Sequence, residues 1–513
     1  MKALLKLLKN KESVFSAIIY SLLFLYLIYP YRDYDWGWHY RYGEYFVKTG
    51  HIMSSDVWTW SMRGYQWVNH EWLYDPLLYI LFSLGSFWAM TLAGAIVGFI
   101  PFVLLLSLYK LSYWQKGILA FFYMQLTSGV YWQGLRSQMI GNLLLAVYLY
   151  FLIKLYHLLL EKYRDKKFSF KVHYPLLILP PLFFLWANLH ASFTMGLLLF
   201  AIFLGSSLLV LFVKNRNQED KERGFYVPLI FIWSLGSFFA SFALTFVNPF
   251  TYHVYIEAIK HTTSFLLPYI TEWTPAGRDS FFFFVFMIFS ILLLVGTLIR
   301  RKLSDLPLCI TALIFFWLAW GARRYNADYV TLALPLGAVA LQSFKVKLER
   351  FKATAFVSVI FLSIAAEVVL FQNLPSYHLW GYSFKDYCDQ GSSCSENLTA
   401  YLLKHPPKGD GFNLYDWGGY LIGRGVQARL FIDGRMHLWE GPNHYYPFLQ
   451  YQKMYYGADF KRFNYYNFDW FIGSTDSILG QILQKTPGWN VAYKDDRAVY
   501  IVRVRESELK SKK

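Results

Sequence analysis

The stretch 281–299 reads FFFFVFMIFSILLLVGTLI and contains no charged residue. Its length falls within the roughly 17–25 residues that a helix needs to cross the hydrocarbon core of a bilayer. Similar apolar runs recur along the chain. They occupy 14–31, 86–109, 117–133, 139–158, 174–189, 194–213, 226–247, 306–321, 326–343 and 353–371. The sequence therefore predicts an α-helical polytopic membrane protein with about eleven transmembrane helices.

The composition agrees with a membrane protein. Of the 513 residues, 56% are hydrophobic and only 16% are charged, whereas soluble domains carry about 25% charged residues. A bilayer can cover that much apolar surface, but a soluble core cannot. The net charge of +16 could suggest nucleic acid, but the basic residues cluster in short loops between apolar runs, as orientation signals do. We therefore expect no nucleic-acid partner.

The distribution of Lys and Arg predicts the orientation. With a cytoplasmic N-terminus, the inside loops hold 22 basic residues in 64 positions, and the outside loops hold 9 in 103. This difference of about fourfold in density has the direction that the positive-inside rule requires. An odd number of spans then places the C-terminal part outside.

Residues 372–513 differ in character from the transmembrane domain predicted at 1–371, and we expect a small extracytoplasmic α/β domain. Short runs typical of strands alternate there with helical patterns. The predicted strands are Phe412 to Tyr415, Arg429 to Ile432, Trp470 to Gly473, Asn490 to Tyr493 and Val499 to Val504. The last two should form a hairpin that turns at Asp495-Asp496.

Two of the three cysteines lie close together in this domain. Cys388 and Cys394 enclose the polar loop CDQGSSC, while Cys309 lies in an apolar run and should be a core residue. In an oxidising compartment the pair would form a disulfide. Two free surface thiols are the alternative, and the spacing alone does not decide between them.

The predicted first outer loop, 32–85, concentrates ionisable and aromatic side chains beside the membrane. Acidic groups in this position suit a divalent cation or the removal of a proton from an acceptor, and aromatic walls suit a sugar ring. The alternative is a solvated loop whose carboxylates pair with arginines. The ionisable residues are Asp33, Asp35, His39, Arg41, Glu44, Asp56, His70, Glu71 and Asp75, with Arg32 and Arg63 as further partners.

Asp35-Trp-Gly-Trp-His-Tyr-Arg41 resembles the first-loop motif of GT-C membrane glycosyltransferases. It is similar to the Asp-Pro-x-Phe-Asn-Tyr-Arg stretch of oligosaccharyltransferase catalytic subunits. In that family the Asp follows the first span and helps to bind the metal ion of the active site. The resemblance implies that Asp35 is catalytic, with His39 beside it, and that Asp35 binds a divalent ion such as Mg²⁺ or Mn²⁺.

Two later segments fit the same resemblance. The stretch 269–272, YITE, looks like the Thr-Ile-x-Glu motif of a later outer loop, so Glu272 is the matching catalytic acid. The stretch 415–420, YDWGGY, is similar to the Trp-Trp-Asp-Tyr-Gly region that opens the soluble domain. The resemblance thus places Asp416 among the residues that bind substrate.

A closer likeness runs along nearly the whole chain, to a family of bacterial multispanning proteins, and it implies the cytoplasmic (inner) membrane of a bacterium. The shared elements are Trp67 to Leu73, Arg136-Ser-Gln138, Trp186-Ala-Asn188-Leu-His190, Asn248-Pro249, Glu272-Trp-Thr-Pro275, Asp416 to Leu421 and Phe431 to Arg435. Together, these patterns give a set of candidate substrate-binding residues. The set is Arg41, His70, Glu71, Arg136, Gln138, Asn188, His190, Arg323, Arg324, Asp416, Asp433 and Arg435.

The chain departs from the GT-C pattern where a second acidic motif usually stands, because residues 133–138 read QGLRSQ. A metal needs several oxygen ligands, so Arg136 is expected instead to hold a lipid-linked phosphate, as are Arg323 and Arg324. The alternative for these arginines is snorkelling to the interface. The alternative role for His190 is packing, and Asp433-Gly434 could instead form an ordinary turn.

Three functions are consistent with these features. The first is a glycosyltransferase that moves a sugar from a polyprenyl-phosphate-linked donor, in the membrane lipid, to an acceptor that the sequence does not identify. The second is a lipid or sugar transporter, for which no clear inverted repeat is found. The third is a GT-C-like scaffold that binds a glycolipid without turnover. We expect the first, with Asp35 acting on the acceptor and Arg136 on the leaving phosphate.

Overall fold

A computed structural model describes residues 11–162, 170–216, 229–344, 382–391 and 394–504. The chain forms two compact units. The helical unit comprises Met1–Pro30, Thr91–Ala258 and Leu267–Tyr377, and the mixed unit comprises Tyr31–Met90, Ile259–Leu266 and His378–Lys513. The domain boundary predicted at 371/372 lies outside the described residues.

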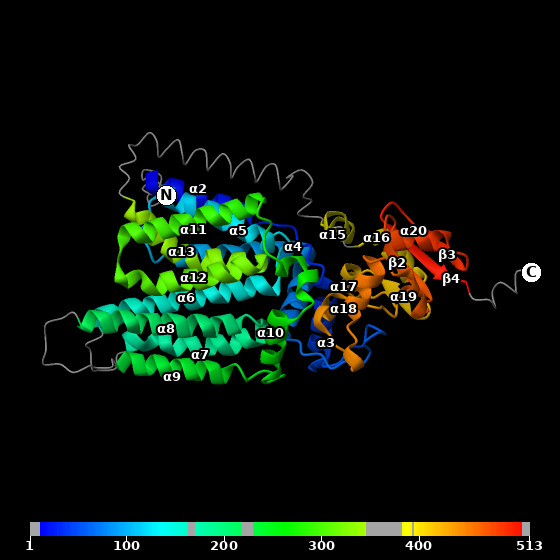
Figure 1. The fold of residues 1–513 in the computed structure, drawn as a ribbon, viewed down its shortest axis with the longest axis horizontal. Helices are drawn as coiled ribbons and strands as arrows, with labels where there is room; N and C mark the ends of the chain where they lie inside the picture. Colours follow the sequence, from blue (N-terminus) through cyan, green and yellow to red (C-terminus); the bar gives the residue numbers. More distant parts are fainter. Residues whose placement is uncertain (1–10, 163–169, 217–228, 345–381, 392–393, 505–513) are drawn as a thin grey trace, which may run out of the picture. The chain divides into compact units, whose positions relative to one another are not determined.

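The helical unit is built around α13, Asn326–Ser343, whose residues are buried from Asn326 to Leu341. This helix contacts α5, α6, α11 and α12. Small residues allow a close approach, since a Cβ at Gly296 of α11 would overlap Ala340, as is usual between membrane helices. The helices of this unit in Figure 1 are α2 Lys11–Tyr26, α5 Tyr113–Tyr131, α6 Ser137–Lys162, α7 Phe170–Leu189, α8 Phe193–Arg216, α9 Leu229–Leu244, α11 Phe281–Arg300 and α12 Leu306–Gly321. Helix α10, His253–Thr263, begins in this unit and ends in the mixed unit.

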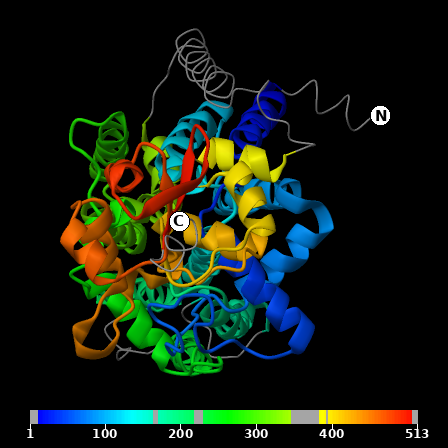
Figure 2. The same ribbon diagram turned by 90° about the vertical axis from the view of Figure 1, so that its right-hand side faces the viewer.

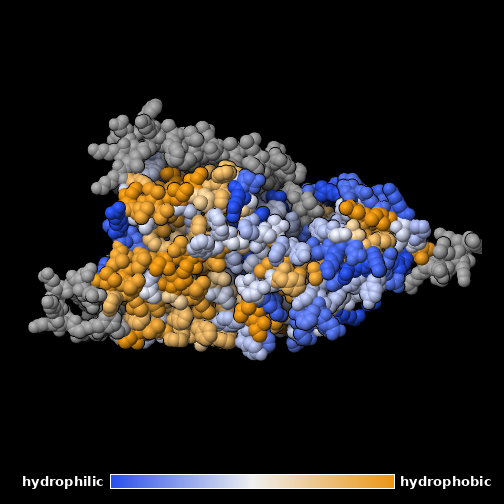
Figure 3. Space-filling view, in the orientation of Figure 1, coloured by the Kyte–Doolittle hydropathy of each residue, from blue (hydrophilic) through white to orange (hydrophobic). Residues whose placement is uncertain are grey.

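Ten of the eleven predicted spans coincide with helices, and the eleventh, 353–371, lies outside the described residues. Among the described helices, α4, α6, α8, α11 and the helix ending at Gly321 are long and apolar enough to cross a membrane, and three apolar helices are shorter. Apolar side chains cover much of the visible face of the helical unit (Figure 3). Its exposed apolar side chains include Phe239, Ile288 and Trp317. The protein is thus a multi-pass membrane protein, and the count of eleven stays a prediction.

Helix α4, Tyr74–Leu106, changes direction within its length. Gly85 and Ser86 have non-helical dihedrals, with Ser86 at φ 55°. The predicted span at 86–109 therefore begins at this break. The part of α4 before it belongs to the mixed unit, as does α3, Trp36–Thr49.

The mixed unit contains a four-stranded sheet in the order β1-β2-β4-β3. Strands β1 and β2 are parallel, and the other two pairs are antiparallel. The bounds are β1 Gly411–Asn413, β2 Trp470–Ser474, β3 Trp489–Lys494 and β4 Ala498–Arg503. Helices and 3₁₀ turns surround it: α15 Phe384–Gly391, α16 Glu396–Lys404, α17 Tyr415–Arg424, η6 Gly434–Leu438, α18 Pro447–Tyr455, α19 Phe460–Tyr465 and α20 Ile478–Lys485.

The predicted C-terminal hairpin is confirmed, and β3 and β4 are the red strands of Figure 2. Asp495 closes its turn, because its backbone N–H donates to Ala498 O over 2.9 Å and its carboxylate accepts the N–H groups of Arg497 and Ala498. The strand predicted at Arg429 to Ile432 is wrong. That segment makes only isolated bridges, because the Asn413 side chain accepts the N–H of Phe431 over 2.8 Å in place of a neighbouring strand.

Within the mixed unit, the segment 32–85, which was predicted to be the first outer loop, contacts the C-terminal part of the chain. Thr59 bridges to Leu430, and the Trp60 indole donates to Gly411 O over 3.0 Å. This segment thus contacts both β1 and the backbone at Leu430. The disulfide predicted between Cys388 and Cys394 is present, with 4.9 Å between the Cα atoms.

Candidate functional site

Glycines set the position of the Asp35 motif in the mixed unit. Helix α3 packs against α17 so closely that a Cβ at Gly37 would overlap Gly419 O, and one at Gly423 would lie 2.5 Å from Gly37 Cα. The sequence motifs around Asp35 and Asp416 therefore pack together as a helix pair. The close contact between these helices leaves no room for a side chain at Gly37 or Gly423.

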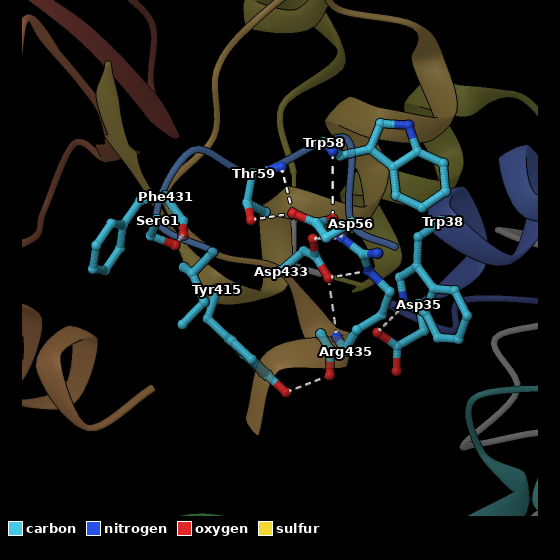
Figure 4. A network of polar contacts seen from close by, with 12 residues as sticks. Asp35, Trp38, Asp56, Trp58, Thr59, Ser61, Tyr415, Phe431, Asp433 and Arg435 are labelled. Atoms are coloured by element: carbon cyan, nitrogen blue, oxygen red, sulfur yellow. Dashed lines mark hydrogen bonds and ion pairs between the residues drawn. The ribbon is translucent and has the colours of Figure 1, made fainter. Parts of the chain in front are cut away.

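Asp35 precedes the first turn of α3 and is half-buried. Its Oδ1 accepts the indole N–H of Trp38 over 2.9 Å, and any side chain at Gly434 would overlap this carboxylate. Figure 4 shows Asp35 beside Arg435 and Trp38. Asp33, in contrast, is buried, and its backbone carbonyl accepts the hydroxyl of Tyr387.

Next to Asp35 lies a fully buried ion network (Figure 4). Arg435 donates through Nη2 to Asp56 over 2.7 Å and to Asp433 over 2.6 Å, and all three side chains have no exposed surface. Although burial opposes the positive charge, Asp433 and Asp56 hold the pKa of the Arg435 guanidinium above its ordinary value. The indole rings of Trp58, Trp67 and Trp439 surround the guanidinium at 4.6–4.9 Å.

This arrangement does not suit a divalent metal on Asp35. Arg435 engages both Asp56 and Asp433, the carboxylates drawn with Asp35 in Figure 4. A hard cation needs several oxygen ligands. Here the carboxylate oxygens of Asp56 and Asp433 already accept hydrogen bonds from the Arg435 guanidinium. No group of three or more His, Cys, Asp and Glu residues in the described ranges is arranged to hold a metal ion.

His39 is buried on α3 between two carboxylates. Its Nδ1 lies 2.5 Å from Asp75 Oδ1, and its Nε2 lies 3.7 Å from Glu71 Oε2. Burial by itself would lower the pKa of His39, but Asp75, helped by Glu71 and Asp33, raises it above the ordinary value. His39 therefore binds its proton more tightly than a free imidazole does. The neighbouring His70 lies 3.4 Å from Glu71 through its Nε2.

The remaining two candidates of the mixed unit lie nearer the surface. Asp416 is exposed on the first turn of α17. Arg41 bonds to Glu44 over 2.5 Å and donates from Nε to Ile422 O over 3.2 Å, which adds a second tie between α3 and α17.

In the helical unit, two arginines share one glutamate. Glu272 lies in the 3₁₀ turn Thr271–Trp273, with Arg136 Nη1 3.4 Å from one carboxylate oxygen and Arg324 Nη1 3.2 Å from the other. The Arg324 guanidinium also stacks over the Trp273 ring at 4.0 Å. Three sequence-predicted residues, Arg136, Glu272 and Arg324, thus meet in this unit.

Other predicted residues of this unit hold the surrounding backbone. Gln138 donates to Arg324 O over 3.1 Å, and Arg323 donates to Pro275 O over 3.2 Å. Asn188 donates to Val247 O over 3.0 Å. His190 Nδ1 accepts the backbone N–H of Ser192 over 3.1 Å, which leaves the ring proton of the neutral imidazole on Nε2.

The sequence analysis did not predict a buried polar cluster close to Arg324. Asn142 donates to Asp328 Oδ1 over 2.9 Å, and its own oxygen accepts the hydroxyls of Tyr131 and Thr331. Asp328 follows Arg324 by one helical turn. An acidic residue near the start of a predicted span is the signal that could have found it.

The fold was compared with solved structures. The apo oligosaccharyltransferase of Archaeoglobus fulgidus matches with a TM-score of 0.53 at 12% identity, covering 91% of this chain and 70% of that chain. ArnT from Cupriavidus metallidurans in the apo state matches with a TM-score of 0.52 at 13% identity, covering 96% and 97%. This chain has a GT-C-like fold.

The GT-C neighbours have also been solved with ligands. The archaeal enzyme AglB was solved with an inhibitory peptide and a dolichol-phosphate, and ArnT with undecaprenyl phosphate. The Archaeoglobus enzyme was further solved with Zn and sulfate. No family model and no curated protein matches the chain, so the likeness to the bacterial multispanning family stays a prediction.

Proposed function

We propose that this protein is a membrane glycosyltransferase. It moves a sugar from a polyprenyl-phosphate-linked donor to an acceptor at the outer face of the cytoplasmic membrane. The observation that carries the proposal is the pair Arg136 and Arg324 on Glu272. The GT-C-like fold supports it.

The arginine pair suits a lipid-linked phosphate. A guanidinium presents a planar fork of donors that matches phosphate oxygens. The two arginines share Glu272, and the ion pairs of Glu272 with Arg136 and Arg324 are 3.4 and 3.2 Å long. A phosphate bound here gains charge as the sugar leaves, so the arginines stabilise the leaving group more strongly in the transition state.

Asp35 is the base that we assign to the acceptor. In the reaction, the bond from the anomeric carbon to the donor phosphate breaks, and a bond to the acceptor heteroatom forms. The acceptor proton passes to the carboxylate of Asp35, and the electron pair of the broken bond stays on the phosphate. Asp433 and Arg435, fully buried, are positioning residues that fix Gly434 against Asp35.

The outer face is supported by two independent features. The basic residues favour the predicted inside loops, and the mixed unit carries the Cys388–Cys394 disulfide. Disulfides persist in oxidising compartments and are rare in the cytosol. The glycolipid-binding scaffold remains the alternative, because it would use the same arginines without turnover.

The test follows radiolabelled sugar from a panel of polyprenyl-phosphate donors in membranes that contain the full chain. We expect Arg136→Gln and Arg324→Gln each to lower transfer about 100-fold, the order found when one transition-state donor is removed. Arg278→Gln is the matched control, because Arg278 is exposed in the predicted outer loop that contains Glu272. Lipid binding without transfer by the wild type would favour the scaffold.

A further inference from the structure

Helix α10 carries a stripe of exposed apolar side chains along one side. Tyr252, just before the helix, and Ile256 and Ile259 within it are exposed to 54%, 43% and 59%. They are four and three positions apart, so they lie above one another on the same side of the helix. Val254, which is buried, points to the opposite side of α10. The helix is therefore amphipathic, with its apolar stripe facing away from the protein.

Tyr255 fixes α10 to the ends of two helices of the helical unit. Its hydroxyl lies 2.5 Å from Thr245 Oγ1, directly after the last residue of α9. Its ring stacks on Phe246 with 5.3 Å between the centroids, and it meets Phe193, the first residue of α8, edge-on at 5.0 Å. Helix α8 is long and apolar enough to cross a membrane. Helix α10 thus begins where such a span ends (Figure 1).

The stripe continues the exposed apolar surface of α9. Phe239 and Phe242 of α9 are exposed, and so is Val247, which lies between α9 and Tyr252. An apolar surface of this kind marks a contact with a partner. For the exposed side of a membrane helix that partner is lipid, and tyrosine side chains are enriched where the lipid meets water. The continuity of the two surfaces therefore identifies the partner of α10 as the same lipid.

We propose that α10 is an interfacial helix whose stripe of Tyr252, Ile256 and Ile259 lies in the membrane lipid. The apolar side of such a helix is buried about 5–10 Å into the boundary between headgroups and acyl chains. The partner is a phospholipid surface, and the contact needs no sugar donor, so it goes beyond the proposed transfer reaction. Glu272 follows α10 in the same predicted loop. The lipid contact would thus hold this loop beside the headgroups.

The test measures how deeply the stripe lies in a bilayer. Ile256→Cys and Ile259→Cys are made separately in the full chain with Cys309→Ser, because Cys309 is the free cysteine among the described residues. Each variant carries a nitroxide label and is reconstituted into nanodiscs of phosphatidylcholine and phosphatidylglycerol. Electron paramagnetic resonance compares collisions of the label with O₂, which enters lipid, and with a water-soluble nickel chelate. We expect both labels to lie about 5–10 Å below the phosphates.

Two further labels calibrate the result. Ile478→Cys on α20 is the matched control, because Ile478 is exposed to 61%, close to the 59% of Ile259, and its label should collide mainly with the nickel chelate. Phe239→Cys on α9 should lie deeper than the stripe. The proposal would be overturned if Ile256→Cys and Ile259→Cys behaved like Ile478→Cys. Protection from both reagents together with spin–spin broadening would also overturn it, because a second copy of the chain would then cover the stripe.

Discussion

At the scale of single residues, Asp35 and Asp33 have different environments although they are two positions apart. Asp35 is half-buried with its carboxylate against Gly434 and Trp38, whereas Asp33 is buried. The sequence resemblance already favoured Asp35, because it stands six residues before Arg41. The structure adds the neighbours that hold it in place.

We therefore expect Asp35→Asn to lower sugar transfer about 10²–10⁴-fold, the usual effect of removing a general base. The substitution keeps the size of the side chain and its bond to Trp38, so folding should survive. Transfer is measured in membranes, with protein amount checked by immunoblot. Wild-type activity in Asp35→Asn would contradict the catalytic assignment. Asp33→Asn, by comparison, should retain more activity.

The second residue-scale prediction concerns pH. The pKa of His39 is raised in the folded state, so the folded protein holds this proton more tightly than the unfolded chain does. The stability that His39 contributes is thus fully present below its unfolded pKa of about 6.5 and is lost as the pH rises through the folded pKa. Melting temperatures of the wild type and His39→Gln, measured from pH 5 to pH 9, should differ most at the acidic end. A constant difference would contradict the prediction.

At the scale of elements, the pairing of α3 with α17 links the two motifs that most resemble the GT-C pattern. Gly37 and Gly419 remove the side chains that would otherwise separate the helices. Because Gly434 lies against Asp35, the same packing fixes the candidate base. A packing defect in this helix pair should therefore affect both stability and activity.

We expect Gly37→Ala to destabilise the protein by about 1–3 kcal/mol, the typical effect of overpacking, and to lower transfer by displacing Asp35. Gly205→Ala is the matched control, because a Cβ at Gly205 of α8 would meet nothing within 4 Å. Thermal unfolding in detergent and transfer in membranes provide the two measurements. Equal behaviour of the two variants would contradict the packing argument.

At the scale of the whole molecule, orientation follows from charge and from redox compartment. The loops predicted to lie inside and outside differ in their content of Lys and Arg, and the disulfide lies in the mixed unit. We expect reporter fusions at residues 220 and 450 to report opposite sides of the membrane, with 220 in the cytoplasm. Signals from the same side would refute this topology. Mass spectrometry of the unreduced protein should find Cys388 and Cys394 linked.

The sequence alone located ten of the described helices, because apolar length is a local property that needs no knowledge of the fold. It also located the C-terminal hairpin, since the turn at Asp495 is closed by residues only two or three positions away. The predicted strand at 429–432 failed for the opposite reason. The backbone of this segment bonds to the Asn413 side chain and bridges to Thr59. Both partners are distant in the sequence, so local patterns cannot predict them.

The surroundings of the candidate groups were decided only by the tertiary structure. Arg435 bonds to Asp56 across 379 positions. This contact depends on which distant segments pack together. The sequence could therefore nominate Arg435 as a charged candidate, but not show that two buried carboxylates engage it. Burial and long-range ion pairs determine the pKa and the available partners of a charged group. Neither can be read from the residues next to it in the sequence.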